Sequence, residues 1–368
     1  MSRTVLELLR LTTRWLGERG CPSPRVDAEV LLAHVLALPR MGLYTAHDRP
    51  LDDAEVDRYR ALVRQRAEGV PVAYLTGTRG FWTLDLAVDE RVLIPRPETE
   101  QLVEEALRRV GERRAAAWRI VDVGTGSGAL ALALAAELPH ARVLGIDLDE
   151  DALAVARANA HLVPDPDRIR FVRGDLLAPL REHPRRPHLI VSNPPYIAAG
   201  DPRVEADVHG HEPHGALYGG DDGLDIIRRL VPQAAAMLAP GGWFLMEMGT
   251  GQGDAVRSLA APHFAEVGVL RDLEGHDRVL WGEAAGALEL GEEPSSEAAV
   301  DAGDAGADRG AGSTEEARAG SGAAAAGVEP EDGDDPPEEG GDPTASTGPA
   351  PAVDAAGRPL PVVDLQSL

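Results

Sequence analysis

The chain has 368 residues, 43% of them hydrophobic, so it is long enough to bury a sizeable core and to form more than one domain. No apolar run approaches the ~20 residues of a membrane span, and a single cysteine excludes an intramolecular disulfide. The formal net charge at pH 7 is −25, and all 36 basic residues are arginine. The N-terminus lacks the continuous apolar centre of a secretory signal, so we expect a cytoplasmic protein.

The negative charge is concentrated near the C-terminus. Residues 284–368 contain 19 acidic residues against three arginines, a balance of −16, which leaves −9 for residues 1–283. Residues 284–368 contain no aromatic side chain and cannot bury enough apolar surface to offset their chain entropy, so we expect a disordered acidic tail. The acidic balance of the remainder argues against a broad nucleic-acid-binding surface.

Residues 1–78 are predicted to form a small helical domain. Three segments, 4–20, 23–38 and 51–69, place apolar residues at steps of three and four. The alternating stretch at 81–95, "FWTLDLAVDERVLIP", then predicts two short strands around "DE". We assign residues 79–95 to a β-hairpin that links two domains.

Residues 96–283 alternate between helical and strand patterns. Helices are expected at 99–110, 128–138, 150–162 and 223–238, and strands at 118–124, 142–148, 169–175, 188–193 and 241–249. Residues 264–283 predict two further strands in a hairpin. Strands that alternate with helices imply a parallel sheet covered on both faces, here closed by an antiparallel pair. The sequence therefore predicts an α/β domain over 96–283.

A glycine-rich loop, "VDVGTGSGA", joins the first of these strands to a helix. Gly124, Gly126 and Gly128 permit a tight turn and let backbone N–H groups approach a ligand closely. Asp147 ends the second strand, where a carboxylate can accept both hydroxyl groups of a ribose. This arrangement predicts a nucleotide-binding site.

The loop alone does not distinguish a site for NAD from a site for S-adenosylmethionine. Ala129 completes the pattern G-x-G-x-x-G/A, so NAD stays open. S-adenosylmethionine fits the same geometry, with Asp122 facing its amino group and Asp175, after the third strand, meeting the adenine amino group. A third acid at that place is expected for the methyl donor and unexplained for NAD. We therefore favour S-adenosylmethionine as the cofactor.

The tetrapeptide Asn193-Pro194-Pro195-Tyr196 follows the strand at 188–193. Its two prolines end the strand and stiffen the backbone. Held rigid, the Asn193 amide oxygen and the Pro194 carbonyl offer two acceptors for the N–H groups of a conjugated nitrogen, and the Tyr196 ring can pack over it. Asn193, Pro194 and Tyr196 are thus the predicted catalytic residues, and Pro195 joins them in substrate binding.

Over nearly all of residues 1–283, the chain resembles the N5-glutamine methyltransferases of peptide chain release factors. The motifs that carry the resemblance are "PVAYLTG", "VLIPRPETE", "DVGTGSGALAL", "SNPPYI", "HEPHGALYGGDDGLDIIRRL", "MEMGTGQ" and "DLEGHDRVLWG". The resemblance implies methyl transfer from S-adenosylmethionine to the side-chain amide of the glutamine in a Gly-Gly-Gln tripeptide. It also implies a seven-stranded Rossmann-like methyltransferase sheet and a helical N-terminal domain that helps to hold the protein substrate.

The resemblance also implies site residues. Family members often carry an aromatic residue after the acid of the third strand, where this chain has Leu176, so stacking on adenine would become aliphatic packing. Asn193 is expected to serve the cofactor as well as the substrate. The cofactor residues that the resemblance carries over are Gly124, Thr125, Gly126, Ser127, Gly128 and Asp147, and Asp175 joins them from its place after the third strand.

The expected partners are release factors as protein substrates, with no membrane, no stable nucleic-acid binding and a monomeric enzyme. One alternative is a nucleic-acid amino methyltransferase acting on adenine N6 or guanine N2, because the same tetrapeptide suits a base amine. Another is a non-catalytic binding protein on a methyltransferase scaffold, which the intact loop and tetrapeptide disfavour.

For several charged residues, the sequence is compatible with either a structural or a functional role. Arg96 and Glu98 are expected to form a buried ion pair, in preference to a catalytic role. Glu212 either borders the substrate pocket or fixes a loop by hydrogen bonding. Glu247, at a strand end, has a structural and a functional reading of equal weight. Without a partnering cysteine or an "HExxH" helix, we expect no metal site at the loosely spaced histidines, His209, His211 and His214.

Overall fold

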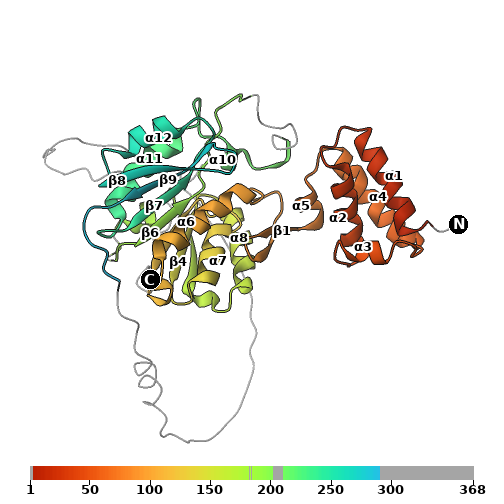
Figure 1. Ribbon diagram of the computed structural model, residues 1–368, viewed down its shortest axis with the longest axis horizontal. Coiled ribbons are helices and arrows are strands. Elements are labelled where there is room, and N and C mark those ends of the chain that lie inside the picture. The colour runs from red at the N-terminus through yellow and green to blue at the C-terminus, as the bar shows by residue number, and fades with distance from the viewer. Residues whose placement is uncertain (1–2, 182, 184, 202–209, 291–368) are drawn as a thin grey trace, which may run out of the picture. The chain divides into compact units, whose positions relative to one another are not determined.

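The computed structural model describes residues 3–181, 183, 185–201 and 210–290 (Figure 1). Apart from residues 284–290, the predicted disordered tail lies outside the described residues. Within the described part, no helix has the length and apolar character needed to cross a membrane.

The N-terminal segment consists of helices, as predicted: α1 (Val5–Gly17), α2 (Pro24–Val35), α3 (Gly42–Thr45), α4 (Asp53–Ala67) and the short α5 (Val72–Thr76). The first and fourth begin at capping boxes, in which Thr4 pairs with Glu7 and Asp52 with Glu55. Their apolar faces meet in a separate core, where the buried Tyr59 hydroxyl donates to the Ala28 carbonyl at 3.0 Å. The domain limits at residues 78, 95 and 283 stay predictions.

The hairpin is shorter than predicted. Strands β1 (Thr78–Phe81) and β2 (Leu84–Ala87) pair antiparallel around a turn at Trp82, whose φ is +55°. The expected hairpin around "DE" over 79–95 is therefore wrong in its turn and in its second strand, because the turn lies at Trp82 and the residues from 88 to 95 form no strand. The segment after β2 forms no strand, although Val88, Val92 and Ile94 are each buried in it. The alternation of apolar and polar residues in the sequence therefore reflects the burial of single side chains and not strand pairing.

A seven-stranded sheet follows, in the order β5-β4-β3-β6-β7-β9-β8. Its strands are β3 (Arg119–Val123), β4 (Arg142–Asp147), β5 (Ile169–Arg173), β6 (Leu189–Ser192), β7 (Trp243–Glu247), β8 (Glu266–Arg271) and β9 (Asp277–Glu283). The first five in chain order pair parallel, and β9 pairs antiparallel with both β7 and β8. Every residue of β6 and β7 is buried, as a sheet covered on both faces requires. The predicted fold class is confirmed.

Helices cover both faces of this sheet (Figure 1). On one face α6 (Glu100–Val110), α7 (Ala129–Glu137) and α8 (Glu150–Asn159) share a core cluster with Trp118. On the other face α11 (Asp225–Met237) and α12 (Gly253–Ala260) pack around Phe244. The sequence analysis missed α12. The remaining short elements are α10 (His214–Leu217), η1 (Pro97–Thr99), η2 (Arg113–Ala115), η3 (Ala160–Leu162), η4 (Pro166–Arg168) and η5 (Ala178–Leu180).

The strand order places the predicted site residues at one edge. The chain runs from β3 outward through β4 to β5, then returns to place β6 on the other side of β3. Ligands of open α/β sheets bind at such a reversal, beyond the carboxyl ends of the strands. Val123 pairs with Ser192 across this point, so the glycine-rich loop and the tetrapeptide leave the sheet side by side.

Candidate active site

The glycine-rich loop after β3 depends on glycine for its conformation. Gly124, Gly126 and Gly128 have φ values of +73°, +53° and +84°, a region that L side chains rarely adopt. A Cβ on Gly124 would lie 3.9 Å from the Asn193 carbonyl oxygen, so the loop closely approaches the tetrapeptide. A Cβ on Gly128 would lie 3.1 Å from the Leu132 side chain, so this glycine also allows α7 to pack.

Most backbone donors of the loop bind within the protein. Gly124 and Thr125 both donate to the Ile146 carbonyl, at 2.8 and 3.0 Å. The Gly126 N–H donates to Oδ2 of Asp147 at 2.8 Å, and Oδ1 of Asp147 accepts the N–H of Asp149 at 3.0 Å. Burial raises the pKa of the Asp147 carboxyl, although these N–H groups act in the opposite direction. The structure therefore brings Asp147 to the loop, as the sequence predicts.

Asp122 lies buried beneath the loop. Its Oδ2 accepts the Thr125 hydroxyl at 2.6 Å and the Ala131 N–H at 3.1 Å. Its Oδ1 is buried and has no hydrogen-bond partner among the described residues. Burial raises the pKa of this carboxyl to about 7. A buried carboxylate oxygen without a donor is suited to an ammonium group of a ligand. The Thr125 and Ser127 side chains are buried as well, and Thr125 holds the loop through Asp122.

Asp175 and Leu176 follow β5 at the same edge. The Asp175 carboxylate forms an ion pair with Arg229 of α11. Leu176 has a φ of +53°, a strained conformation for a residue with a side chain, and packs partly buried against the cluster around Phe244. The predicted contacts of both residues with adenine stay predictions.

The side chains of the tetrapeptide are fixed by two residues from other elements. Asn193 Nδ2 donates to Thr99 Oγ1 at 3.1 Å, and the Thr99 hydroxyl donates to Glu247 Oε2 at 2.7 Å. The Tyr196 hydroxyl donates to the second oxygen of the same carboxylate, Glu247 Oε1, at 2.9 Å. No described residue donates to Asn193 Oδ1, so this oxygen remains as an acceptor. We call these four residues the Glu247 network.

The backbone of the tetrapeptide rests on two glycine-containing loops. A Cβ on Gly219 would lie 2.5 Å from the Pro195 carbonyl oxygen, and one on Gly223 would lie 2.2 Å from the Tyr196 carbonyl oxygen. The Gln252 side chain donates to this Tyr196 carbonyl at 3.0 Å. Only glycine permits the contacts at Gly219 and Gly223, which explains why the stretch "ALYGGDDGL" accompanies "SNPPY" in this chain.

The segment that carries Thr99 is held by a buried carboxylate. Glu212 accepts the Ile94 N–H at 3.1 Å and the Arg96 guanidinium at 2.5 Å. The expected ion pair between Arg96 and Glu98 is therefore wrong, because the η1 turn leaves Glu98 exposed while Glu212 reaches Arg96 from a distant loop. The loop-fixing reading of Glu212 is confirmed.

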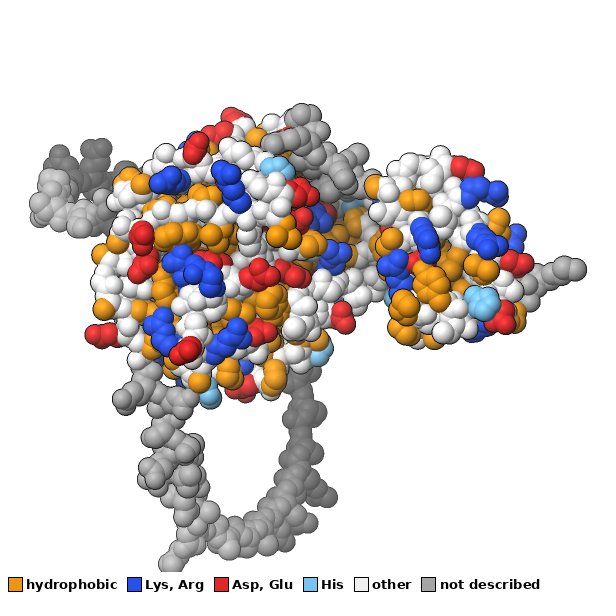
Figure 2. Space-filling view, viewed as in Figure 1, with side chains coloured by type: hydrophobic (Ala, Val, Ile, Leu, Met, Phe, Trp, Pro, Cys, Tyr) orange, Lys and Arg blue, Asp and Glu red, His pale blue; other side chains and the backbone are white. Residues whose placement is uncertain are grey.

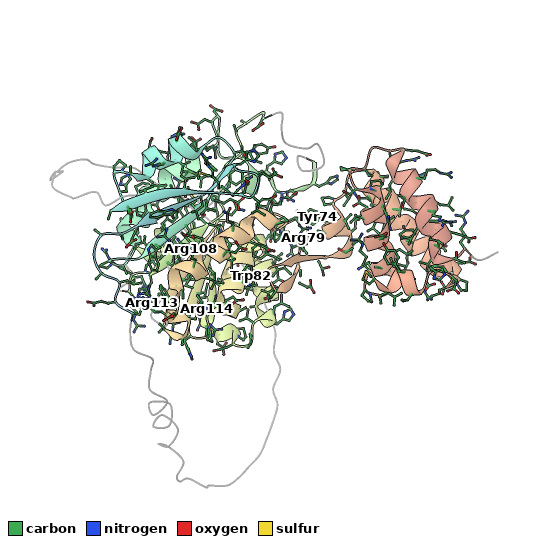
Figure 3. The ribbon with its side chains drawn as sticks, viewed as in Figure 1. Tyr74, Arg79, Trp82, Arg108, Arg113 and Arg114 are labelled. Carbon is green, nitrogen blue, oxygen red and sulfur yellow. The ribbon has the colours of Figure 1, made fainter. Side chains whose placement is uncertain are left out.

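Side chains of α5 and the short hairpin also bind this segment (Figure 3). The Tyr74 hydroxyl donates to the Val92 carbonyl at 2.6 Å, and Arg79 Nε donates to the Pro95 carbonyl at 3.2 Å. The Trp82 indole N–H donates to Glu137 of α7 at 2.9 Å. Residues 88–99 are thus fixed at several points before they deliver Thr99 to the tetrapeptide.

Among the residues that the structure describes, no group of three or more His, Cys, Asp or Glu side chains could hold a metal ion. His209 lies outside the described residues. The sequence analysis did not single out Thr99 or Gln252. The only signal for Thr99 was its place in "VLIPRPETE", and Glu247 was marked only by being an acid that ends an apolar strand.

Comparisons with known proteins show which families and relatives this chain matches. Residues 7–77 match the model of the PrmC N-terminal domain, and residues 101–208 match that of the Methyltransferase small domain. The release factor glutamine methyltransferase of Xylella fastidiosa (strain 9a5c) is 48% identical over 263 residues, which are 71% of this chain and 94% of the relative. The corresponding protein of Geobacter sulfurreducens is 41% identical over 281 residues, 76% of this chain and 96% of the relative.

Among solved structures, the chain is similar to a release-factor-specific protein-(glutamine-N5) methyltransferase from Alicyclobacillus acidocaldarius. The identity is 32% and the TM-score 0.34, over 52% of this chain and 94% of that one. It is also similar to the 16S rRNA N2 G1207 methyltransferase of Thermus thermophilus, at 22% identity and a TM-score of 0.42, over 56% and 49% of the two chains.

Proposed function

The chain belongs to the family of release factor glutamine methyltransferases, and from this premise we propose its reaction. It is an S-adenosylmethionine-dependent protein-glutamine N-methyltransferase. Its substrate is the side-chain amide nitrogen (N5) of the glutamine in the Gly-Gly-Gln tripeptide of a peptide chain release factor.

The observation that carries this proposal is the orientation of the Asn193 amide. Its nitrogen is used by Thr99, and its oxygen is left to accept, next to the rigid Pro194 carbonyl. The nitrogen of a substrate amide is a weak nucleophile because its lone pair is delocalised into the carbonyl. Two fixed acceptors for its two N–H groups hold it in one orientation and favour the pyramidal, more nucleophilic form. The site thus acts by positioning.

The residues around the glycine-rich loop suit the methyl donor. When bound, S-adenosylmethionine supplies an electrophilic methyl group on a sulfonium. Asp147 would hold its ribose, Asp122 Oδ1 its ammonium group, and Asp175 and Leu176 its adenine. The unpaired, buried oxygen of Asp122 supports this fit, because it lacks the donor that an ammonium would provide.

A nucleic-acid substrate is less well supported. On the face drawn in Figure 2, arginine side chains alternate with acidic ones. Arg108 and Arg109 of α6 pair with Glu105, and Arg114 pairs with Glu137. Paired arginines of this kind do not form the open basic surface that neutralises phosphates. We further propose that the enzyme acts as a monomer in the cytoplasm, without stable nucleic-acid binding, and that residues 1–78 help to hold the release factor.

The test is transfer of labelled methyl from S-adenosylmethionine to a purified release factor, with DNA and ribosomal RNA offered in parallel. We expect label on the factor, and none on a factor whose Gly-Gly-Gln glutamine is changed to alanine. Label on nucleic acid alone would support the chemistry assigned to the tetrapeptide and overturn the substrate.

A further inference from the structure

Thr99 and Glu247 lie outside the tetrapeptide, yet they join its two functional side chains through one carboxylate. Glu247 ends β7, and Thr99 ends the η1 turn before α6. Both are buried, and the hydrogen bonds that link them to Asn193 and Tyr196 measure 2.7 to 3.1 Å. These contacts come from three separate parts of the chain.

The protons in the Glu247 network can be placed by counting donors and acceptors. Each oxygen of Glu247 lies within hydrogen-bond distance of one hydroxyl, that of Tyr196 or of Thr99, and with both hydroxyls donating, Glu247 is an ionised carboxylate. The single hydroxyl proton of Thr99 is then used, and its oxygen can only accept. Asn193 must therefore turn its NH₂ group toward Thr99 and its carbonyl oxygen away from it.

This orientation matters because an asparagine amide has nearly the same shape when rotated by half a turn. In the rotated form, Asn193 would present two N–H donors to the N–H groups of the substrate, and the interaction would become repulsive. The Pro194 carbonyl cannot rotate in this way. Asn193 is thus the acceptor whose orientation needs to be set by a neighbour.

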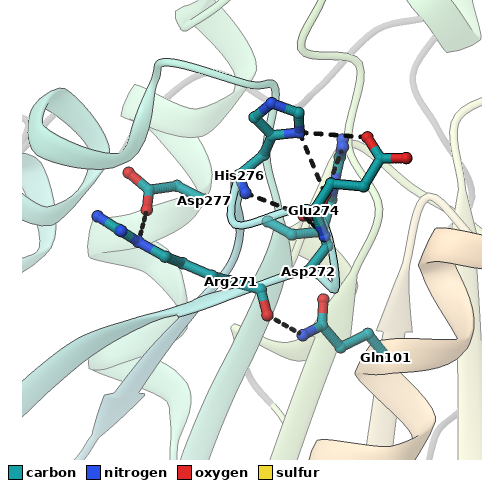
Figure 4. A network of polar contacts seen from close by, with 7 residues as sticks. Gln101, Arg271, Asp272, Glu274, His276 and Asp277 are labelled. Atoms are coloured by element: carbon teal, nitrogen blue, oxygen red, sulfur yellow. Dashed lines mark hydrogen bonds and ion pairs between the residues drawn. The ribbon is translucent and has the colours of Figure 1, made fainter.

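Burial raises the pKa of the Glu247 carboxyl, while the hydrogen bonds from Thr99 and Tyr196 and the positive charge of Arg278 of β9 act in the opposite direction. Arg278 is itself held by Asp272 at 3.0 Å, in the turn between β8 and β9. Asp272 also accepts the N–H groups of Glu274 and His276, at 3.0 and 2.9 Å, which fixes the turn between β8 and β9 (Figure 4).

We propose that Thr99 and Glu247 are positioning residues that set the direction of the Asn193 amide and anchor the Tyr196 ring for methyl transfer. The proposal rests on the proposed function for its kinetic consequences, but the orientation of the amide can be tested without it.

The chain contains only two asparagines, Asn159 and Asn193, so protein labelled with ¹⁵N-asparagine gives two side-chain amide signals. Asn159 is an internal control, because it donates to the carbonyls of Ala87 and Ser127 at 3.0 and 2.9 Å. In the full chain without ligands, Thr99→Val should shift the Asn193 signal and speed its exchange with water, while the Asn159 signal stays. Thr99→Ser keeps the hydroxyl and should restore the signal. An Asn193 signal that is the same in Thr99→Val and the wild type would overturn the proposal.

The kinetic test uses the release factor as substrate. Thr99→Val and Glu247→Gln should each lower kcat by about 10²-fold, as expected when one preorganised group is lost, with the dissociation constant of S-adenosylmethionine unchanged. Thr99→Ser should stay close to the wild type. An unchanged kcat in Thr99→Val, or an equal loss in Thr99→Ser, would contradict the proposal. Absence of methylation by the wild-type enzyme would instead refute the proposed function, and the amide signals would still decide the orientation.

Discussion

The Gly126 N–H donates to Oδ2 of Asp147 across 2.8 Å, which ties the loop after β3 to the carboxyl end of the neighbouring strand. The glycine provides the backbone conformation, with a φ of +53°, and the acid provides the acceptor. The loop and its predicted ribose-binding carboxylate are thus one unit, held in place by the protein itself.

Substitution of Asp147 should weaken the binding of S-adenosylmethionine more than it lowers the stability of the fold. Asp147→Asn keeps an acceptor for Gly126 but loses the charge and one acceptor, and we expect the dissociation constant of S-adenosylmethionine to rise about tenfold or more. Calorimetric titration measures this directly. The control is Asp151→Asn on the exposed first turn of α8, which should leave the dissociation constant unchanged. Equal effects in both variants would remove Asp147 from the cofactor site.

Asp122 should make stability depend on pH. Its pKa is raised from the usual 3.8 to about 7, so between these values the folded protein keeps a proton that the unfolded chain has lost. Stability from this group is therefore present at low pH, falls as pH rises through this window, and is lowest above pH 7. Asp122→Asn should raise the free energy of unfolding at pH 8 by about 1–3 kcal/mol, and not at pH 4.

The same variant should bind S-adenosylmethionine more weakly, because it no longer offers a charge to the ammonium group. Urea unfolding at several pH values and a donor titration at pH 8 check both effects. A purely structural acid would show the gain in stability without the loss of affinity, and that result would contradict the assigned role.

The sequence predicted what is local and missed what joins distant segments. Gly124 and Asp147 were found because a strand, a tight turn and an acid at a strand end each leave a local pattern. The bond from Asn193 to Thr99 joins residues 94 apart, and the bond from Arg96 to Glu212 joins residues 116 apart. Such partners depend on how elements pack, so Glu98, only two residues from Arg96, was chosen instead. The hairpin was set too long for a related reason, since single buried residues such as Val92 and Ile94 imitate a strand's alternation.

The glycine loops behind the tetrapeptide should control its position. Gly223→Ala places a Cβ 2.2 Å from the Tyr196 carbonyl oxygen, at a φ of +75°. Gly20→Ala is a matched control, because its φ of +78° carries the same backbone strain but nothing lies within 4 Å of the new Cβ. Both should lose about 1–2 kcal/mol of stability from the strain. Only Gly223→Ala should also lower kcat, by about tenfold or more, since the tetrapeptide must move. Similar kcat values in the two variants would show that the contact is irrelevant to catalysis.

Arg96 and Glu212 should contribute to the free energy of unfolding as a pair, so that the effect of changing one depends on the other. Arg96→Met leaves a buried carboxylate without its partner, and we expect a loss of about 3–5 kcal/mol in the free energy of unfolding. Glu212→Gln keeps an acceptor for the Ile94 N–H and should cost less. The double variant should recover much of the loss seen in Arg96→Met, because it leaves no buried charge. A double-mutant cycle by urea unfolding measures the coupling, and additive losses would show that the pair does not act as a unit.

Residues 284–290 should contribute to the stability of the α/β domain. Leu288 and Leu290 pack partly buried against the core cluster that contains Trp118, and the Gly241 N–H donates to the Ala284 carbonyl at 3.2 Å. A chain that stops after Leu290 should keep the melting temperature and the kcat of the full-length protein. One that stops after Glu283 loses this packing and should be less stable by about 2–4 kcal/mol, given the usual gain from burying two leucine side chains incompletely. Thermal melts of the three chains make the comparison. Equal melting temperatures for the two truncated chains would show that residues 284–290 add nothing to the core.

The same chains test the acidic tail. A KM for the release factor that is raised in both truncated chains would assign the acidic tail a part in substrate binding.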